Sequence, residues 1–259
     1  MALDGASDAE IIEWFEGILA AARDRYPCPT WAEVYGEHLD HVIDFWGERD
    51  QPLVVISIHG GYFAAHYDRG VNEPVCRAMA SMGALVANVE YSRAGGCTDP
   101  MDSVRDVRAA VAHVVNSVRP GTRVVVTGHS AGGYLALAAS TVLGIDAVVA
   151  LAPVTDLWEC SVGGWDDEEI ARWIGVLPHE SPDQWHRMRL ENVGMGDVPC
   201  VVIHGATDGV VPLSQSEVFV AARGPETRLV ALPGVGHYEF LDADSAATAA
   251  LLAELGLPG

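Results

Sequence analysis

Serine, aspartate and histidine side chains stand in three separate glycine-rich loops of this sequence. Ser130 lies in the pattern Gly-x-Ser-x-Gly, Asp208 lies in a loop bounded by glycines, and His237 directly follows a glycine. A histidine can take the proton of a serine hydroxyl, and a carboxylate bonded to its other ring nitrogen holds the required tautomer and stabilises the imidazolium. Together these side chains would transfer an acyl group through a covalent serine intermediate.

The segment around Ser130 predicts a sharp turn from strand to helix. Three valines and a threonine precede it at 124–127, and a run rich in alanine and leucine follows it at 131–139. The glycines two positions before and after the serine leave room for close backbone approach while the serine side chain projects above the sheet. The N–H of Ala131 has no partner within the helix, so we expect it to donate to a developing oxyanion.

A second buried strand, at 53–58, runs directly into a loop that begins with histidine and two glycines. Adjacent glycines at the end of a strand let the main chain approach a substrate with free N–H groups aimed inward. We expect the N–H of Gly61, with that of Tyr62 as a further candidate, to face the substrate oxygen together with Ala131. His59 is expected to brace this loop by hydrogen bonding rather than to carry protons.

Three aspartates compete for the role of the acid. Asp208 follows the predicted strand 198–204, and the carboxyl ends of parallel strands are where open sheets place ligand-binding groups. Asp156 also follows a strand and is the more serious rival, although it could instead cap the next helix. Asp197 is the third candidate. We favour Asp208.

The elements that would carry these loops alternate between strand and helix. Strands are expected at 41–46, 53–58, 84–89, 124–127, 145–151, 198–204 and 227–232. Helices are expected at 7–25, 71–82, 102–118, 131–139, 213–222 and 245–255. This alternation predicts an α/β fold with a mainly parallel central sheet flanked by helices. Without an internal repeat or a long linker, we expect one domain over residues 1–259, with an N-terminal helical segment at 1–30.

The N-terminal segment has the pattern of an amphipathic helix. Apolar residues recur at helical spacing between Ser7 and Arg25, and Ser7 with Glu10 three positions later has the signature of a capping box. We expect this helix to pack on the edge of the domain. The sequence Tyr-Pro-Cys-Pro at 26–29 would end it.

Composition limits the partners and the compartment. The formal net charge of -21, from 15 basic and 36 acidic residues, repels phosphate backbones and disfavours nucleic acid. Five cysteines without Cys-x-x-Cys spacing favour reduced thiols. No apolar run is long enough to cross a bilayer, and the acidic start is unlike a signal peptide. We therefore expect a cytoplasmic protein with no membrane partner. A homodimer is an open alternative to a monomer.

These motifs resemble the α/β-hydrolase superfamily over about residues 35–255. The order of nucleophile, acid and base along the chain matches that family, and the residues at 58–63, 90–93, 128–133 and 236–237 are most similar to its esterase and arylformamidase (kynurenine formamidase) branch. Formamidases of that branch carry His-Gly-Gly-x-Trp, where this chain has Phe63. Esterases of the hormone-sensitive-lipase type carry a third glycine where this chain has Tyr62, so Tyr62 favours formamidase and Phe63 departs from it.

A tryptophan-rich insertion interrupts the alternating core between Asp156 and Asp197. In this fold, an insertion after the strand that follows the serine turn usually forms a lid. The resemblance therefore implies a short lid at 156–197. Phe63, Trp158 and Trp165 are then candidates to line an apolar or aromatic substrate pocket. The alternative is that the rings form the core of the lid itself.

The sequence thus predicts a serine hydrolase that cleaves a small ester or activated amide, without a metal or an organic cofactor. The best single substrate is an aryl formamide such as N-formylkynurenine. The alternative is a general carboxylesterase of the hormone-sensitive-lipase type, and a third hypothesis is a small-molecule binder that uses a hydrolase fold without chemistry. The substrate is expected to be a small, apolar or aromatic molecule.

Overall fold

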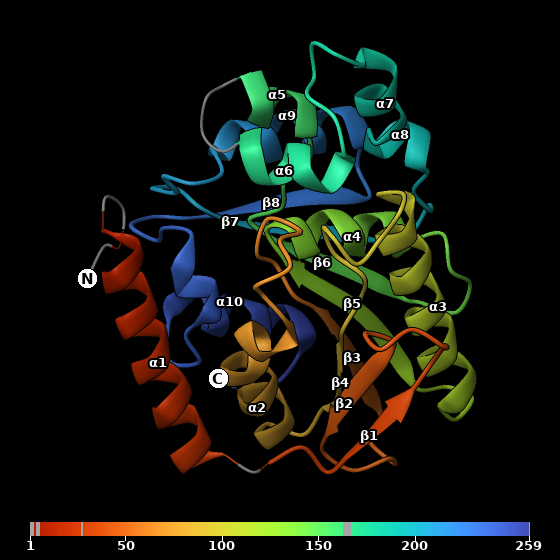
Figure 1. The fold of residues 1–259 in the computed structure, drawn as a ribbon. Helices are drawn as coiled ribbons and strands as arrows, with labels where there is room; N and C mark the ends of the chain where they lie inside the picture. The colour runs from red at the N-terminus through yellow and green to blue at the C-terminus, as the bar shows by residue number, and fades with distance from the viewer. Residues whose placement is uncertain (1–2, 4–5, 27, 163–166, 259) are drawn as a thin grey trace.

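A mostly parallel sheet of eight strands forms the centre of the protein (Figure 1). The computed structural model describes residues 3, 6–26, 28–162 and 167–258. The strands are β1 (Trp31–Val34), β2 (Val42–Trp46), β3 (Leu53–Ile58), β4 (Leu85–Val89), β5 (Arg123–His129), β6 (Ala147–Leu151), β7 (Cys200–Gly205) and β8 (Thr227–Leu232). Their order in the sheet is β1-β2-β4-β3-β5-β6-β7-β8, and only the β1–β2 and β2–β4 pairs are antiparallel.

Helices connect the strands and cover both faces of the sheet. They are α1 (Asp8–Arg25), η1 (Arg69–Asn72), α2 (Glu73–Ser81), α3 (Met101–Ser117), α4 (Ala131–Ala139), α5 (Leu157–Val162), α6 (Asp167–Ile174), α7 (Pro182–Arg187), α8 (Leu190–Val193), α9 (Leu213–Arg223), η2 (Tyr238–Leu241) and α10 (Ala246–Leu255). This architecture confirms the predicted fold class. Among the described residues, no helix is both long enough and apolar enough to cross a membrane.

Two separate hydrophobic cores lie on the two faces of the sheet. In β3, Val54 and Ile56 point to a core shared with α3, α4 and α9, whereas Leu53 and Val55 point to a core shared with α2 and α10. This alternation follows from the two-residue period of a strand. Because both faces are covered, every residue of β3 is buried, including Ser57, as the mostly apolar composition of this segment predicts.

Register brings the predicted site loops to one edge of the sheet. The last residue of β3, Ile58, pairs with Gly128 of β5, so the loop after β3 begins beside the turn that carries the serine. Gly205 at the end of β7 pairs with Leu232 at the end of β8, so the loops that follow these two strands also lie side by side. All four loops leave the carboxyl ends of parallel strands.

Some elements differ from the sequence-based expectations. Strand β1 was not expected; it is an edge strand whose residues alternate between partly buried and exposed. The predicted helix at 71–82 begins instead as the 3₁₀ turn η1, and α2 starts only at Glu73, where Pro74 occupies its first turn. Helix α1 begins at Asp8 with the expected capping box between Ser7 and Glu10.

Candidate active site

Ser130 occupies a strained turn between β5 and α4. Its backbone has φ 57° and ψ -119°, a conformation that non-glycine residues rarely adopt. The surrounding chain fixes this conformation: the Ser130 N–H donates to the carbonyl of Leu151 at 2.8 Å, and its carbonyl accepts the N–H of Gly133 at 2.9 Å. The turn therefore holds the serine side chain above the end of the sheet.

The glycines on either side of Ser130 are required by close backbone contacts. A Cβ atom on Gly128 would lie 2.1 Å from the carbonyl oxygen of Gly132, and one on Gly132 would lie 2.2 Å from the carbonyl oxygen of Ile58. Both distances are far below van der Waals contact, so neither position accepts a side chain without movement of the main chain. The Gly-x-Ser-x-Gly pattern thus has a geometric cause at both of its glycines.

Asp208 and His237 form a hydrogen-bonded pair across the loops after β7 and β8. His237 Nδ1 lies 2.7 Å from Asp208 Oδ2, and the other carboxylate oxygen accepts the backbone N–H groups of Val210 and Val211 at 2.9 and 2.7 Å. Burial alone would raise the pKa of Asp208, but the charge of His237 and the hydrogen bonds from His204, His237 and Val211 hold this pKa well below its ordinary value. Asp208 is therefore a carboxylate, and His237 must donate from Nδ1.

A second histidine, His204, braces the Asp208 loop. Its Nε2 atom lies 2.9 Å from the carbonyl oxygen of Val211 and 3.3 Å from Asp208 Oδ2, and its Nδ1 lies 2.6 Å from Ser216 Oγ. The ring is completely buried. Sequence reasoning did not assign His204 a role, although its place at the end of a strand just before the Asp208 loop was visible.

The loop after β3 is held by a buried pair, His59 and Glu90. His59 Nε2 lies 2.9 Å from Glu90 Oε1, and Nδ1 lies 2.8 Å from the carbonyl oxygen of Gly60. Burial would raise the pKa of Glu90, but the hydrogen bond and charge of His59, with the N–H of Arg69, lower it to about 2. His59 therefore connects the loop after β3 to Glu90, and this pair holds the loop in place.

The predicted oxyanion-hole residues gather around the serine. Gly61 and Tyr62 line one cavity together with Ser130, and Ala131 is the first residue of α4. Gly61 has φ 102°, and Tyr62 and Phe63 have φ 57° and 58°. A Cβ on Gly61 would lie 2.5 Å from the Cβ of Tyr67, so this position also requires glycine. The role of Gly61, Tyr62 and Ala131 as oxyanion donors stays a prediction.

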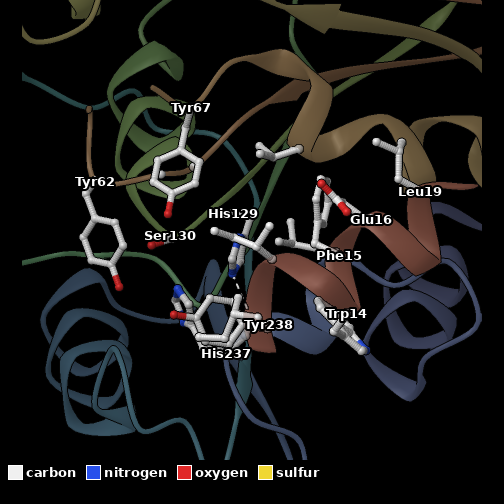
Figure 2. Close-up of a pocket in the computed structure, with 16 residues that line it drawn as sticks. Trp14, Phe15, Glu16, Leu19, Tyr62, Tyr67, His129, Ser130, His237 and Tyr238 are labelled. Carbon is white, nitrogen blue, oxygen red and sulfur yellow. Dashed lines mark hydrogen bonds between the residues drawn. The ribbon is translucent and has the colours of Figure 1, made fainter. Parts of the chain in front are cut away.

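The cavity above the serine has a volume of about 350 Å³. Ser130 and His237 both line it, so the predicted nucleophile and base face the same space. Figure 2 shows Tyr62 and Tyr67 beside Ser130, with Tyr238 beside His237. The opposite wall comes from α1, through Ile11, Ile12, Trp14, Phe15, Glu16 and Leu19. The sequence predicted that α1 packs on the edge of the domain, but it did not predict that α1 also forms a wall of this cavity.

Two of the aromatic residues predicted to line the pocket, Phe63 and Trp158, do not line the cavity of Ser130. Phe63 is 1% exposed and stacks on Trp173 with ring centroids 3.8 Å apart, because the turn at 61–63 directs its ring into the core. Trp158 packs edge-on against Trp185 and His186 of α7. Trp165 lies outside the described residues. The pocket assignment of Phe63 and Trp158 is therefore corrected: both pack in or against the core.

The described residues of the insertion after β6 lie away from the cavity of Ser130. None of its described residues lines the cavity of Ser130; α5 to α8 instead pack beyond α4, at the top of Figure 1. Asp156, the rival acid, caps α5, since its Oδ1 accepts the N–H groups of Trp158 and Glu159 at 2.9 and 3.1 Å. Asp197 is exposed and does not line the cavity.

His129, the residue before the serine, positions the loop of the base. Its Nε2 lies 3.0 Å from the carbonyl oxygen of His237, which is a hydrogen-bond distance (dashed line in Figure 2). Burial and the nearby charge of His237 lower the pKa of His129 well below its ordinary value, so it stays neutral.

Within the described part of the chain, no group of three or more His, Cys, Asp or Glu side chains is arranged to hold a metal ion.

The strand order and the serine turn define the class of protein. A mostly parallel eight-stranded sheet, with a strained serine between strand and helix and an Asp–His pair after the last two strands, is the α/β-hydrolase fold. The chain belongs to the BD-FAE family, whose profile matches residues 46–222.

Named relatives agree with this class. Esterase LipC of Mycobacterium tuberculosis is 28% identical over 242 residues, which cover 81% of this chain and 60% of LipC. The chain thus spans little more than half the length of this curated relative. Two solved structures share the fold: a truncated carbohydrate esterase from gut microbiota (TM-score 0.74, 20% identity, 90% of this chain and 97% of the other) and Esterase B from Lactobacillus rhamnosis (TM-score 0.71, 18% identity, 96% and 95%).

Proposed function

We propose that this protein is a serine hydrolase that cleaves carboxylic esters through an acyl-enzyme. The observation that carries the proposal is the shared cavity of Ser130 and His237, with the imidazole held at 2.7 Å by the Asp208 carboxylate. A serine on a strained turn, a base in the same space and an ionised orienting acid are the parts that nucleophilic acyl transfer requires.

The proposed reaction has two halves. In the first, Ser130 Oγ attacks the ester carbonyl while His237 takes its proton, and the N–H groups of Ala131 and Gly61 stabilise the negative charge on the carbonyl oxygen. Collapse of this intermediate breaks the bond to the alcohol, which leaves with the proton from His237. In the second half, His237 takes a proton from water, the hydroxide attacks the acyl-enzyme, and Ser130 leaves with the proton as the acid is released.

An ester is favoured over an aryl formamide. The named relatives are esterases. Two of the aromatic residues that led to an aryl formamide, Phe63 and Trp158, lie in or against the core. The cavity has other aromatic side chains, from Trp14, Phe15 and Tyr67, so it could also hold an aryl group. Formamide cleavage therefore enters the experiment as a competing outcome.

Labelling and turnover test this proposal together. A fluorophosphonate probe should label the wild-type protein at Ser130 and leave a folded Ser130→Ala variant unlabelled, because only an activated serine reacts. The wild type should also hydrolyse p-nitrophenyl butyrate faster than N-formylkynurenine at equal concentrations. The reverse preference would assign a formamidase, and a folded wild type with neither labelling nor turnover would leave a non-catalytic binder.

A further inference from the structure

The outer wall of the cavity is built by a segment outside the part of the chain that matches the family profile. The match covers residues 46–222, whereas the wall belongs to α1, at Asp8–Arg25. Figure 2 shows Phe15 and Leu19 of α1 across the cavity from Ser130. The segment that matches the family therefore contributes the nucleophile, and α1 contributes the surface opposite to it.

Helix α1 is fixed to the domain at its C-terminal end. Arg23 makes two hydrogen bonds to Glu73 of α2, at 2.9 and 2.6 Å, and Arg77 of α2 donates to Glu73 and to the carbonyl of Tyr26, both at 2.8 Å. Ala22 is buried beside these contacts, at 4% exposure. These bonds hold the helix in register with α2, so the wall is preformed.

The apolar side chains of α1 are only partly covered by the protein. Ile11 and Phe15 are half-buried although they face the cavity, and Ile12 is 57% exposed. A surface helix normally turns its apolar stripe to a core that covers it. Here the first half of the stripe faces the space above Ser130, so an apolar group of a substrate would complete its burial.

One acidic side chain stands on the same wall. Glu16 is exposed and lines the cavity beside Ile12 and Phe15, and the whole chain carries a formal net charge of -21. An anionic group entering here would meet a like charge beside an apolar surface, which is unfavourable. The wall is thus suited to uncharged apolar groups and unsuited to carboxylates.

We propose that α1 determines specificity: it binds the uncharged apolar group of the ester, so the substrates are neutral esters with an alkyl chain of several carbons or an aromatic ring. This inference rests on the proposed function, because it places the ester at Ser130. Phe15 and Ile12 supply the apolar contact, and Glu16 rejects esters whose far end is a carboxylate.

A chain-length series tests the apolar contact. The specificity constant kcat/KM of the wild type is expected to be about tenfold or more higher for methyl hexanoate or for hexyl acetate than for methyl acetate. Phe15→Ala should lower that preference about tenfold. Ile18→Ala is the matched control, because Ile18 is a half-buried apolar residue of α1 that does not line the cavity; it should leave the preference unchanged. Ile12→Asp, at an exposed position where folding is not at risk, should also lower the preference.

A pair of substrates with the same chain length but different charge tests the acidic contact. Monomethyl adipate differs from methyl hexanoate in carrying a carboxylate in place of the terminal methyl group. The wild type should prefer methyl hexanoate by about a hundredfold, and Glu16→Gln should reduce this ratio several-fold. Glu13→Gln, at another exposed glutamate of α1 that does not line the cavity, should leave the ratio unchanged.

The outcomes separate this inference from the proposed function. Equal specificity constants for all three neutral esters, or equal effects of Phe15→Ala and Ile18→Ala, would overturn the role of α1 while ester hydrolysis stands. If Phe15→Ala and Ile12→Asp lose the preference for the longer esters and Ile18→Ala keeps it, the role of α1 is supported. If no ester is cleaved and Ser130 is not labelled, the proposed function fails; calorimetric binding of methyl hexanoate to wild type, Phe15→Ala and Ile18→Ala then tests the wall directly, and equal affinities would overturn it.

Discussion

Replacing Asp208 with asparagine is expected to lower the turnover number by about four orders of magnitude, because it reverses the hydrogen bond that orients His237. On one side of the carboxylate, Oδ1 accepts two backbone N–H groups, from Val210 and Val211. On the other side, Oδ2 accepts from His237 Nδ1 and lies 3.3 Å from His204 Nε2. The amide oxygen of asparagine can serve only one side. The backbone donors cannot turn away, so the amide nitrogen takes the Oδ2 position and points a proton at His237.

The imidazole must then change its tautomer. To accept from the amide, His237 carries its proton on Nε2 and leaves Nδ1 bare, and a ring with a protonated Nε2 cannot take the proton of Ser130. A loss of about four orders of magnitude corresponds to about 5 kcal/mol of transition-state stabilisation. The fold should survive, because the two side chains have nearly the same shape.

The assay compares this variant with Asp156→Asn. Asp156 uses one oxygen to cap α5, a role that asparagine fills about equally well, so this control should retain turnover within about twofold. The measurement is kcat for p-nitrophenyl butyrate, with the thermal midpoint as a check on folding. A folded Asp208→Asn protein within tenfold of wild type, or a larger loss in Asp156→Asn, would refute the assignment of the acid.

Three further predictions concern Ser130, Glu90 and the pair of glycines Gly132 and Gly17. Ser130→Ala should keep its thermal midpoint and lose about four or more orders of magnitude in kcat; near-normal turnover would end the serine mechanism. Glu90 has a pKa of about 2, below its ordinary 4.5, so its stabilisation is present above pH 4.5 and is lost as the pH falls toward 2. Urea unfolding at pH 7 and pH 3 should therefore show a loss about 2 kcal/mol smaller in Glu90→Gln than in wild type, and equal losses would contradict this. Gly132→Ala should destabilise the fold by more than about 3 kcal/mol through its contact with Ile58, whereas Gly17→Ala, with nothing within 4 Å, should stabilise it by about 0.5–1 kcal/mol in the same measurement.

The features that could be predicted from the sequence are those with local causes. The turn at Ser130 needs glycines at fixed spacing between a β-branched run and an alanine-rich run, and each of these has a recognisable composition. The pairing of Asp208 with His237 could be expected because both follow buried strands, and parallel strands bring their carboxyl ends to one edge. The bracing role of His59 followed from its place beside two glycines.

The features that could not be predicted depend on tertiary packing. Phe63 and Trp158 were assigned to the pocket because aromatic rings suit both pockets and cores, and only the path of the chain decides between them. The amphipathic pattern of α1 shows that one face is apolar but not which surface it meets. Glu90 and His204 are single polar residues at strand ends, where no spacing marks them as partners of His59 and Asp208.

The strained turn at Ser130 also constrains when the site can form during folding. Its N–H is bonded to Leu151 at the end of β6, and its carbonyl accepts the N–H of Val154, more than twenty residues later in the chain. A chain that is synthesised from its N-terminus therefore cannot hold the serine in place until β6 has paired with β5. Asp208 and His237 are made later still. A partly synthesised chain would thus bind no substrate productively, and the appearance of fluorophosphonate labelling on arrested chains of increasing length would report completion of the sheet.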